Sequence, residues 1–144
     1  MTDNKDDILQ KSKYYSYCIK LTAALATVSL PFPISNTTKL KIKQLRYVTA
    51  SSNQEMMIIK IMGWVDNNFY FDGSNLRDYT RIVQLPPTLG SVILYENLNS
   101  EMWDVVKKSS VSYINNFRVE VLIDGTYSTD ISVSNPLYLE FVLE

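Results

Sequence analysis

The chain has 144 residues, of which 46% are hydrophobic and 20% charged, and its formal net charge at pH 7 is -1. This length suits one domain with a substantial core, and the charge gives no general reason to expect binding to nucleic acid or to an acidic membrane. The sequence contains no histidine, which excludes serine–histidine and cysteine–histidine catalytic pairs and most catalytic zinc sites.

The single cysteine, Cys18, rules out an intrachain disulfide and favours an intracellular, reducing compartment. The one signal-like run, residues 19–30, is shorter than the ~20 residues that a membrane helix requires. We therefore expect neither a cleaved signal nor a membrane span.

Residues 1–13 are polar and charged, and we expect an N-terminal arm that is either flexible or a short helix. Residues 14–144 are predicted to form a single domain. Its first strand covers about residues 14–29, where apolar side chains alternate, and ends before Pro31 and Pro33. Cys18 lies on the face of this strand opposite Tyr17, and we interpret it as a buried, inert thiol.

A second strand is predicted over residues 39–49, with a β-bulge at Lys43-Gln44 where the alternation slips by one position. Lys39, Lys41 and Lys43 share one face of it. Such a row is typical of a solvated face that discourages wrong strand pairing, and it is also a candidate interface. Residues 55–65 are apolar on both faces and predict a central strand.

Shorter strands follow over residues 68–72, 79–85 and 91–96, the first of them closed by the turn residues Asp72-Gly73. After these strands the spacing of the apolar residues no longer has the two-residue period of a strand. Ser100 is placed to cap a helix, Asp104 lies near its start, and Lys107 and Lys108 lie near its end. This charge order predicts one short helix near residues 100–108, with Trp103 facing the core.

The last two strands, residues 116–123 and 136–143, alternate most clearly between apolar and polar side chains. Eight short strands with almost no helix predict an all-β, eight-stranded jelly-roll sandwich. The last strand should then be central and lie beside the first.

No residue pattern points to catalysis, and we expect no enzyme activity and no cofactor. Asp66, Asp72 and Asp78 bracket one loop region, and Asp124 and Asp130 bracket another. Aspartates in turns normally accept hydrogen bonds from their own backbone, and we interpret these in that way. Calcium in the last loop and an enzyme that uses paired carboxylates are the alternatives.

Tyrosine is frequent, and three tyrosines cluster at the start of the domain: Tyr14, Tyr15 and Tyr17. A large ring that ends in a hydroxyl suits a protein interface. These three, with Lys39, Lys41 and Lys43, are the predicted contact residues. The partners we expect are protein chains, not nucleic acid.

The end of the chain resembles small single-jelly-roll proteins, minor capsid or penton-like, of large DNA viruses and virophages. The resemblance is carried by Asp124-Gly125-Thr126-Tyr127-Ser128-Thr129-Asp130-Ile131 and Ser134-Asn135-Pro136-Leu137-Tyr138-Leu139-Glu140. With the strand count it covers about residues 14–144. It implies a protein of the virion, put together inside the host cell, that packs with itself and other capsid proteins into a symmetric shell.

A second function stays open from the same strand pattern. A carbohydrate- or receptor-binding β-sandwich, such as a lectin or a tumour-necrosis-factor-like oligomer, has similar strands. Glycan binding would use an exposed aromatic side chain beside loop acids, for which Trp64 and Tyr127 are the candidates.

Overall fold

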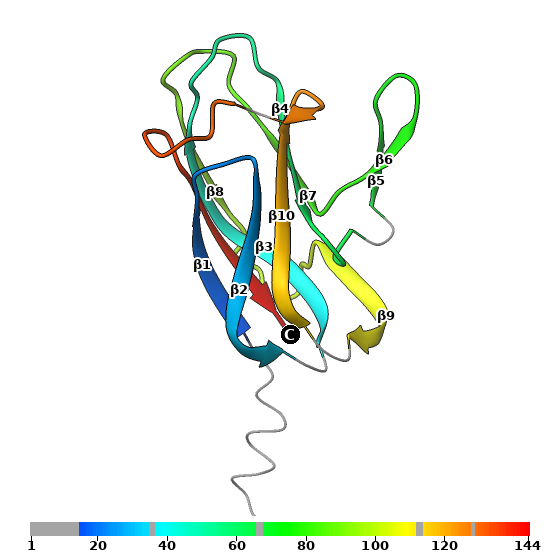
Figure 1. The fold of residues 1–144 in the computed structure, drawn as a ribbon. Helices are drawn as coiled ribbons and strands as arrows, with labels where there is room; N and C mark the ends of the chain where they lie inside the picture. The colour runs from blue at the N-terminus through cyan, green and yellow to red at the C-terminus, as the bar shows by residue number, and fades with distance from the viewer. Residues whose placement is uncertain (1–14, 35–36, 66–67, 112–113, 128) are drawn as a thin grey trace, which may run out of the picture.

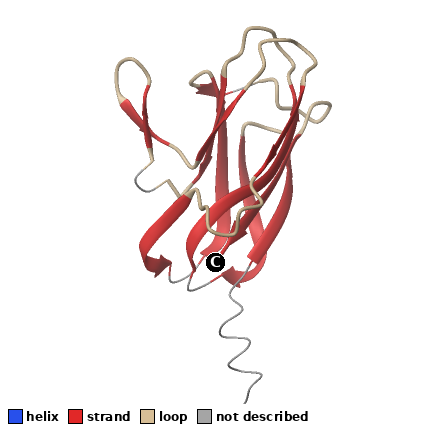
Figure 2. Ribbon diagram, turned by 180° about the vertical axis from the view of Figure 1, so that it is seen from behind, coloured by secondary structure: helices blue, strands red, loops and turns tan. Residues whose placement is uncertain are grey.

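In the computed structural model the described residues, 15–34, 37–65, 68–111, 114–127 and 129–144, form strands and loops and contain no helix (Figures 1 and 2). The strands are β1 Tyr15–Leu21, β2 Leu25–Ile34, β3 Thr37–Val48, β4 Met56–Ile61, β5 Phe69–Phe71, β6 Leu76–Asp78, β7 Arg81–Gln84, β8 Val92–Glu96, β9 Val105–Val111, β10 Ile114–Ile123, β11 Thr126–Tyr127 and β12 Leu137–Leu143. No helix in this part of the chain has the length and apolar character needed to cross a membrane.

Two antiparallel sheets pack face to face as a β-sandwich (Figure 1). Sheet A has the order β1-β12-β3-β8, with β9 also paired to β3; sheet B has the order β11-β10-β4-β7, with β2 also paired to β10. The inward side chains of β10 and β12 lie in the core between the sheets, as their alternation predicted: Phe117, Val119, Val121, Ile123, Leu137, Leu139, Phe141 and Leu143. The Phe117 and Phe141 rings meet edge to face at 5.0 Å.

The strand pairing is nested, so that early strands pair with late ones. The pairs are β1 with β12, β2 with β10, β3 with β8 and β4 with β7. The last strand, β12, lies between β1 and β3 in sheet A. The predicted position of this strand, central and beside the first, is confirmed.

The first predicted strand, residues 14–29, is two strands that belong to different sheets. β1 lies in sheet A and β2 in sheet B, and residues 22–24 connect them. β2 also continues past Pro31 and Pro33, which is possible because it lies at an edge of its sheet, where a missing backbone N–H is tolerated. The predicted central strand corresponds to β4, between β10 and β7.

The predicted β-bulge is confirmed. Glu140 of β12 faces Gln44, and the next residue, Phe141, faces Ile42, so Lys43 is the extra residue on β3.

The predicted short helix near residues 100–108 is wrong. Residues 100–104 form a loop, and residues 105–111 form strand β9, which pairs with the first part of β3. The β-branched residues Val105 and Val106 suit a strand, and burial of Val105 against the core outweighs the helix-like charge order.

The predicted N-terminal arm, residues 1–13, and Tyr14 lie outside the described residues.

Candidate functional site

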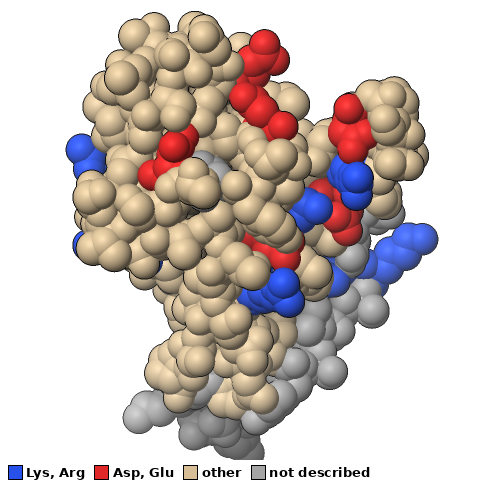
Figure 3. Space-filling model, turned by 45° about the horizontal axis from the view of Figure 1, so that its top comes forward, with Lys and Arg blue, Asp and Glu red and all other residues tan. Residues whose placement is uncertain are grey.

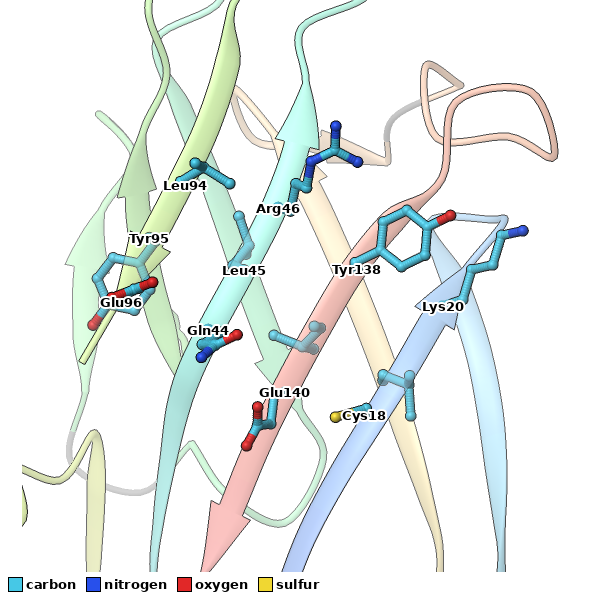
Figure 4. A pocket seen from close by; sticks show the side chains of 12 residues that line it. Cys18, Lys20, Gln44, Leu45, Arg46, Leu94, Tyr95, Glu96, Tyr138 and Glu140 are labelled. Atoms are coloured by element: carbon cyan, nitrogen blue, oxygen red, sulfur yellow. The ribbon is translucent and has the colours of Figure 1, made fainter. Parts of the chain in front are cut away.

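A groove of about 420 Å³ crosses the outer face of sheet A (Figure 4). The register of the strands arranges its outward side chains in two straight rows. One row runs Lys20, Tyr138, Arg46, Leu94, and the other runs Cys18, Glu140, Gln44, Glu96. Each row takes one residue from each of β1, β12, β3 and β8.

The groove combines apolar surface with charges of both signs. Tyr138 is 42% exposed and Leu94 70% exposed, while the first row also carries two cations and the second two carboxylates. The Lys20 ammonium lies 5.9 Å from the centre of the Tyr138 ring. Glu140 lies 3.6 Å from the Lys43 ammonium and accepts a hydrogen bond from Ser16. This surface suits a ligand that presents hydroxyl and apolar groups together.

Residues 97–104, the edge loop, interrupt the edge of sheet A. The chain leaves at the end of β8, where Asn97 N–H donates to Lys43 O, and returns at β9, where Asp104 N–H donates to Leu40 O. Between these points no described strand pairs with Ile42 on this side. Its N–H donates to the Asp104 carboxylate at 2.7 Å, so a side chain completes the ladder.

Asp104 is held at the edge between the two sheets. Its side chain is 4% exposed, and Arg81 of β7 in sheet B lies 3.4 Å from its second oxygen. Burial raises the pKa of Asp104 above its ordinary value, and the Ile42 N–H and Arg81 oppose that shift. Arg81 also lies over the Tyr95 ring, and a polar cavity of about 320 Å³ opens beside this cluster.

The predicted lysine row lies under the edge loop. Lys41 is 6% exposed and its ammonium donates to Asn99 O at 2.9 Å, while the Trp103 ring lies 5.7 Å from Lys39 and 5.2 Å from Lys41. Lys43 pairs with Glu140. The interpretation as a solvated face is therefore wrong for Lys41, because the loop that was expected to be a helix covers it. Contact of these lysines with another chain stays a prediction.

Of the three tyrosines in the predicted cluster, Tyr15 and Tyr17 lie within the described residues and Tyr14 does not. Both rings point inward and pack partly buried against the core. The Tyr17 ring lies 5.6 Å from Phe141 and 6.3 Å from Phe117, and burial raises its pKa. Because β1 is an edge strand, these rings stay partly exposed, and their role in an interface stays a prediction.

Two expectations for single residues are wrong. Cys18 is exposed, since the face opposite Tyr17 is the outer face of sheet A and not a second buried layer. Trp64 is 1% exposed, which removes it as a glycan-stacking residue, whereas Tyr127 is exposed.

The loop aspartates accept hydrogen bonds within the fold. Asp72 accepts N–H groups of Ser74 and Asn75, and Asp124 accepts those of Glu55 and Met56. Asp130 accepts Ser51 and Gln54, and Asp78 pairs with Lys60. Asp66 lies outside the described residues. Within the described residues no three acids or cysteines gather as a metal site would require.

The β5–β6 hairpin, residues 69–78, lies in the segment that connects β4 to β7, and it projects from the sandwich (Figures 1 and 2). One of its faces is apolar and open to solvent: Phe69 is 58%, Phe71 67% and Leu76 69% exposed. Phe71 and Leu76 are opposite each other in the pairing, and Phe69 lies two residues before Phe71 on the same face.

Sequence reasoning did not single out the apolar face of the hairpin or the two rows of the groove. The alternation Phe69-Tyr70-Phe71 was a usable signal for the first. The rows depend on which strands are neighbours, and the sequence does not contain that information locally.

Neither the family models nor the curated proteins with which the chain was compared give a match.

Proposed function

We propose that this chain is a non-enzymatic structural protein with a jelly-roll fold that assembles into or cements a symmetric shell, as a minor capsid-type protein of a large DNA virus or virophage. The nested pairing of eight strands is the observation that carries the proposal. A jelly roll has eight antiparallel strands in two sheets, formed by two Greek keys. Pairing of β1 with β12, β2 with β10, β3 with β8 and β4 with β7 is what folding one long hairpin into a sandwich would produce.

The β5–β6 hairpin supports assembly independently of the strand order. A two-stranded hairpin is at best marginally stable alone, and its apolar side chains stabilise it only if they are buried. Here Phe69, Phe71 and Leu76 face solvent, while the described contacts of the hairpin with the sandwich are the Tyr70 and Tyr79 rings at 6.1 Å and the Asp78–Lys60 ion pair at 3.2 Å. Burial of this apolar face against another protein would stabilise the hairpin.

The charge distribution on the face at the loop end favours contact with protein. On this face acidic and basic side chains both occur, and the lysines and arginines do not form one continuous patch (Figure 3). A nucleic-acid surface would instead concentrate lysine and arginine on one face.

Negative-stain microscopy and sedimentation velocity of the purified protein, alone and with its natural partners, test the proposal. We expect symmetric oligomers or incorporation into particles within a virion or its assembly intermediates in the host cell. The matched variant carries Phe69→Ser, Phe71→Ser and Leu76→Ser, and it should fold normally but lose incorporation. A protein that is monomeric at every concentration and with every partner would overturn the proposal.

The groove on sheet A favours a second function, binding of a carbohydrate or a receptor. An exposed aromatic ring flanked by carboxylates and cations can stack on a sugar and hydrogen-bond to its hydroxyl groups. On a glycan array Tyr138→Ala should abolish binding, while Tyr127→Ala, an exposed tyrosine outside the groove, should not. Binding that neither substitution changes would exclude the groove as the site, and no binding to any glycan on the array would count against carbohydrate binding.

A further inference from the structure

β1 is a seven-residue edge strand of sheet A. It pairs with β12 over its whole length, from Tyr15 opposite Leu143 to Leu21 opposite Leu137. No other described strand pairs with it, so its outer edge presents backbone N–H and C=O groups that can accept a further strand.

The other described edges of the two sheets carry features that hinder strand addition. In β2, Pro31 and Pro33 lie within the stretch where pairing with β10 is irregular. β7, β8 and β11 are short, with four, five and two residues, and β9 carries adjacent lysines, Lys107 and Lys108. β1 has no proline and no bulge, and its one charged residue, Lys20, lies near its end.

The inward side chains of β1 are incompletely covered. Tyr15, Tyr17 and Ile19 pack against the core but stay partly exposed, whereas Leu21, next to the connection to β2, is buried. An added strand would cover the exposed side of these three residues.

We propose that β1 pairs antiparallel with β1 of a second copy of this chain, about a two-fold axis at Cys18. In this register Tyr15 faces Leu21, Ser16 faces Lys20, Tyr17 faces Ile19, and Cys18 faces its own symmetry mate. The apolar residues meet on the inner face, and each lysine faces a serine and not another lysine. The strand is therefore complementary to itself, as a two-fold interface requires.

This register is the one that uses the whole strand. Moving the axis by one residue in either direction leaves two residues of β1 without a partner in β1 of the other copy. The pairing makes sheet A continuous across two copies, and the two grooves then meet at the axis, because Cys18 and Lys20 line them. The inference names one interface and rests on the proposal that the chain assembles.

The exposed Cys18 provides the first test. Residues directly opposite in an antiparallel pair have Cα atoms about 4.5–5.5 Å apart, which a disulfide can span. Oxidation with copper phenanthroline should give a covalent dimer that dithiothreitol reverses. Cys18→Ser should give none. Cys18→Ser with Ser16→Cys should also give none, because the two new thiols would lie about 13 Å apart at ~3.3 Å per residue.

Charge at the axis provides the second test. Cys18→Lys places two ammonium groups face to face in the dimer but leaves them solvated in the monomer, so it should lower dimer affinity at least tenfold with an unchanged melting temperature. Cys18→Glu should lower dimer affinity in the same way, and it should also lower the melting temperature slightly, because Glu140 of β12 lies directly opposite residue 18. An equimolar mixture of the two variants should restore the dimer in sedimentation velocity.

The outcomes separate this inference from the proposed function. Two results together would overturn the β1 pairing and leave assembly standing. These are Cys18→Lys oligomers as stable as those of the wild type, and wild-type oligomers that do not cross-link through Cys18. A wild-type protein that is monomeric under all conditions would overturn both.

Discussion

The edge loop and the β5–β6 hairpin are both insertions at strand edges of the sandwich, but the side chains of the loop pack on the sandwich and the apolar side chains of the hairpin do not. The edge loop folds back: Asp104 completes the β3 ladder and Trp103 covers two lysines. The hairpin projects, and its apolar residues Phe69, Phe71 and Leu76 stay in solvent. An insertion whose side chains find partners in the same chain belongs to the fold, whereas one whose apolar side chains find none is suited to another molecule.

Asp104→Ala should have the largest effect among changes to the two insertions. It leaves the buried Ile42 N–H without an acceptor and Arg81 without its carboxylate, and we expect a loss of about 2–3 kcal/mol in the free energy of unfolding. Chemical denaturation followed by fluorescence measures it. Asp104→Asn keeps an acceptor oxygen and should lose less; equal losses would show that the hydrogen bond to Ile42 is unimportant.

Trp103→Ala should cost about 1–2 kcal/mol, since the ring covers Lys39 and Lys41 and each such contact contributes about 0.5–1 kcal/mol. Met102→Ala changes an exposed neighbour in the same loop and should shift the unfolding midpoint very little. If the two variants have the same stability, the edge loop does not stabilise the sandwich.

Replacing residues 69–78 with two glycines should lower the free energy of unfolding by less than about 1 kcal/mol, and most of that loss should come from the Lys60–Asp78 ion pair. The ends of the removed segment meet, because Tyr79 N–H donates to Asn68 O at 3.1 Å. The shortened protein should lose incorporation into particles and keep the Cys18 cross-link. A strongly destabilised product would mean that the hairpin belongs to the fold after all, as the edge loop does.

The contributions of Asp104 in the edge loop and Asp72 in the hairpin to the free energy of unfolding should depend on pH with opposite signs. Burial raises the pKa of Asp104 above 3.8, so its contribution to stability is present at low pH and declines as pH rises from 3.8 through the raised value. The Asn75 N–H and Arg77 lower the pKa of Asp72 to about 2, so its contribution is present above 3.8 and declines as pH falls toward 2.

Carboxyl NMR titration separates the two groups, with Asp104→Asn and Asp72→Asn used for assignment. A raised pKa for Asp72 or a lowered one for Asp104 would contradict the described surroundings of these carboxylates.

Local alternation was enough to predict the faces of β10 and β12 and the bulge at Lys43, because each depends on a few consecutive residues. The break between β1 and β2 was missed, since Ala23 and Ala24 are small and continue an apolar run without marking a turn. The edge loop was predicted as a helix because its charge order resembles one, while the acceptor that Ile42 requires is visible only when β3 and residue 104 are adjacent. The groove was missed for the same reason, since its rows come from four strands that are distant in sequence.

The pairing of β1 with β12 has a consequence for how the chain folds. Tyr15 and Leu143 are opposite each other, so sheet A cannot be completed until residues 137–143 have been synthesised. Contacts between residues this distant in sequence slow folding, because loop-closure entropy is lost before they form. During that interval β1 and β3 both lack their shared neighbour, and folding intermediates would expose two strand edges to aggregation. We expect the yield of folded protein in refolding experiments to fall as the protein concentration is increased.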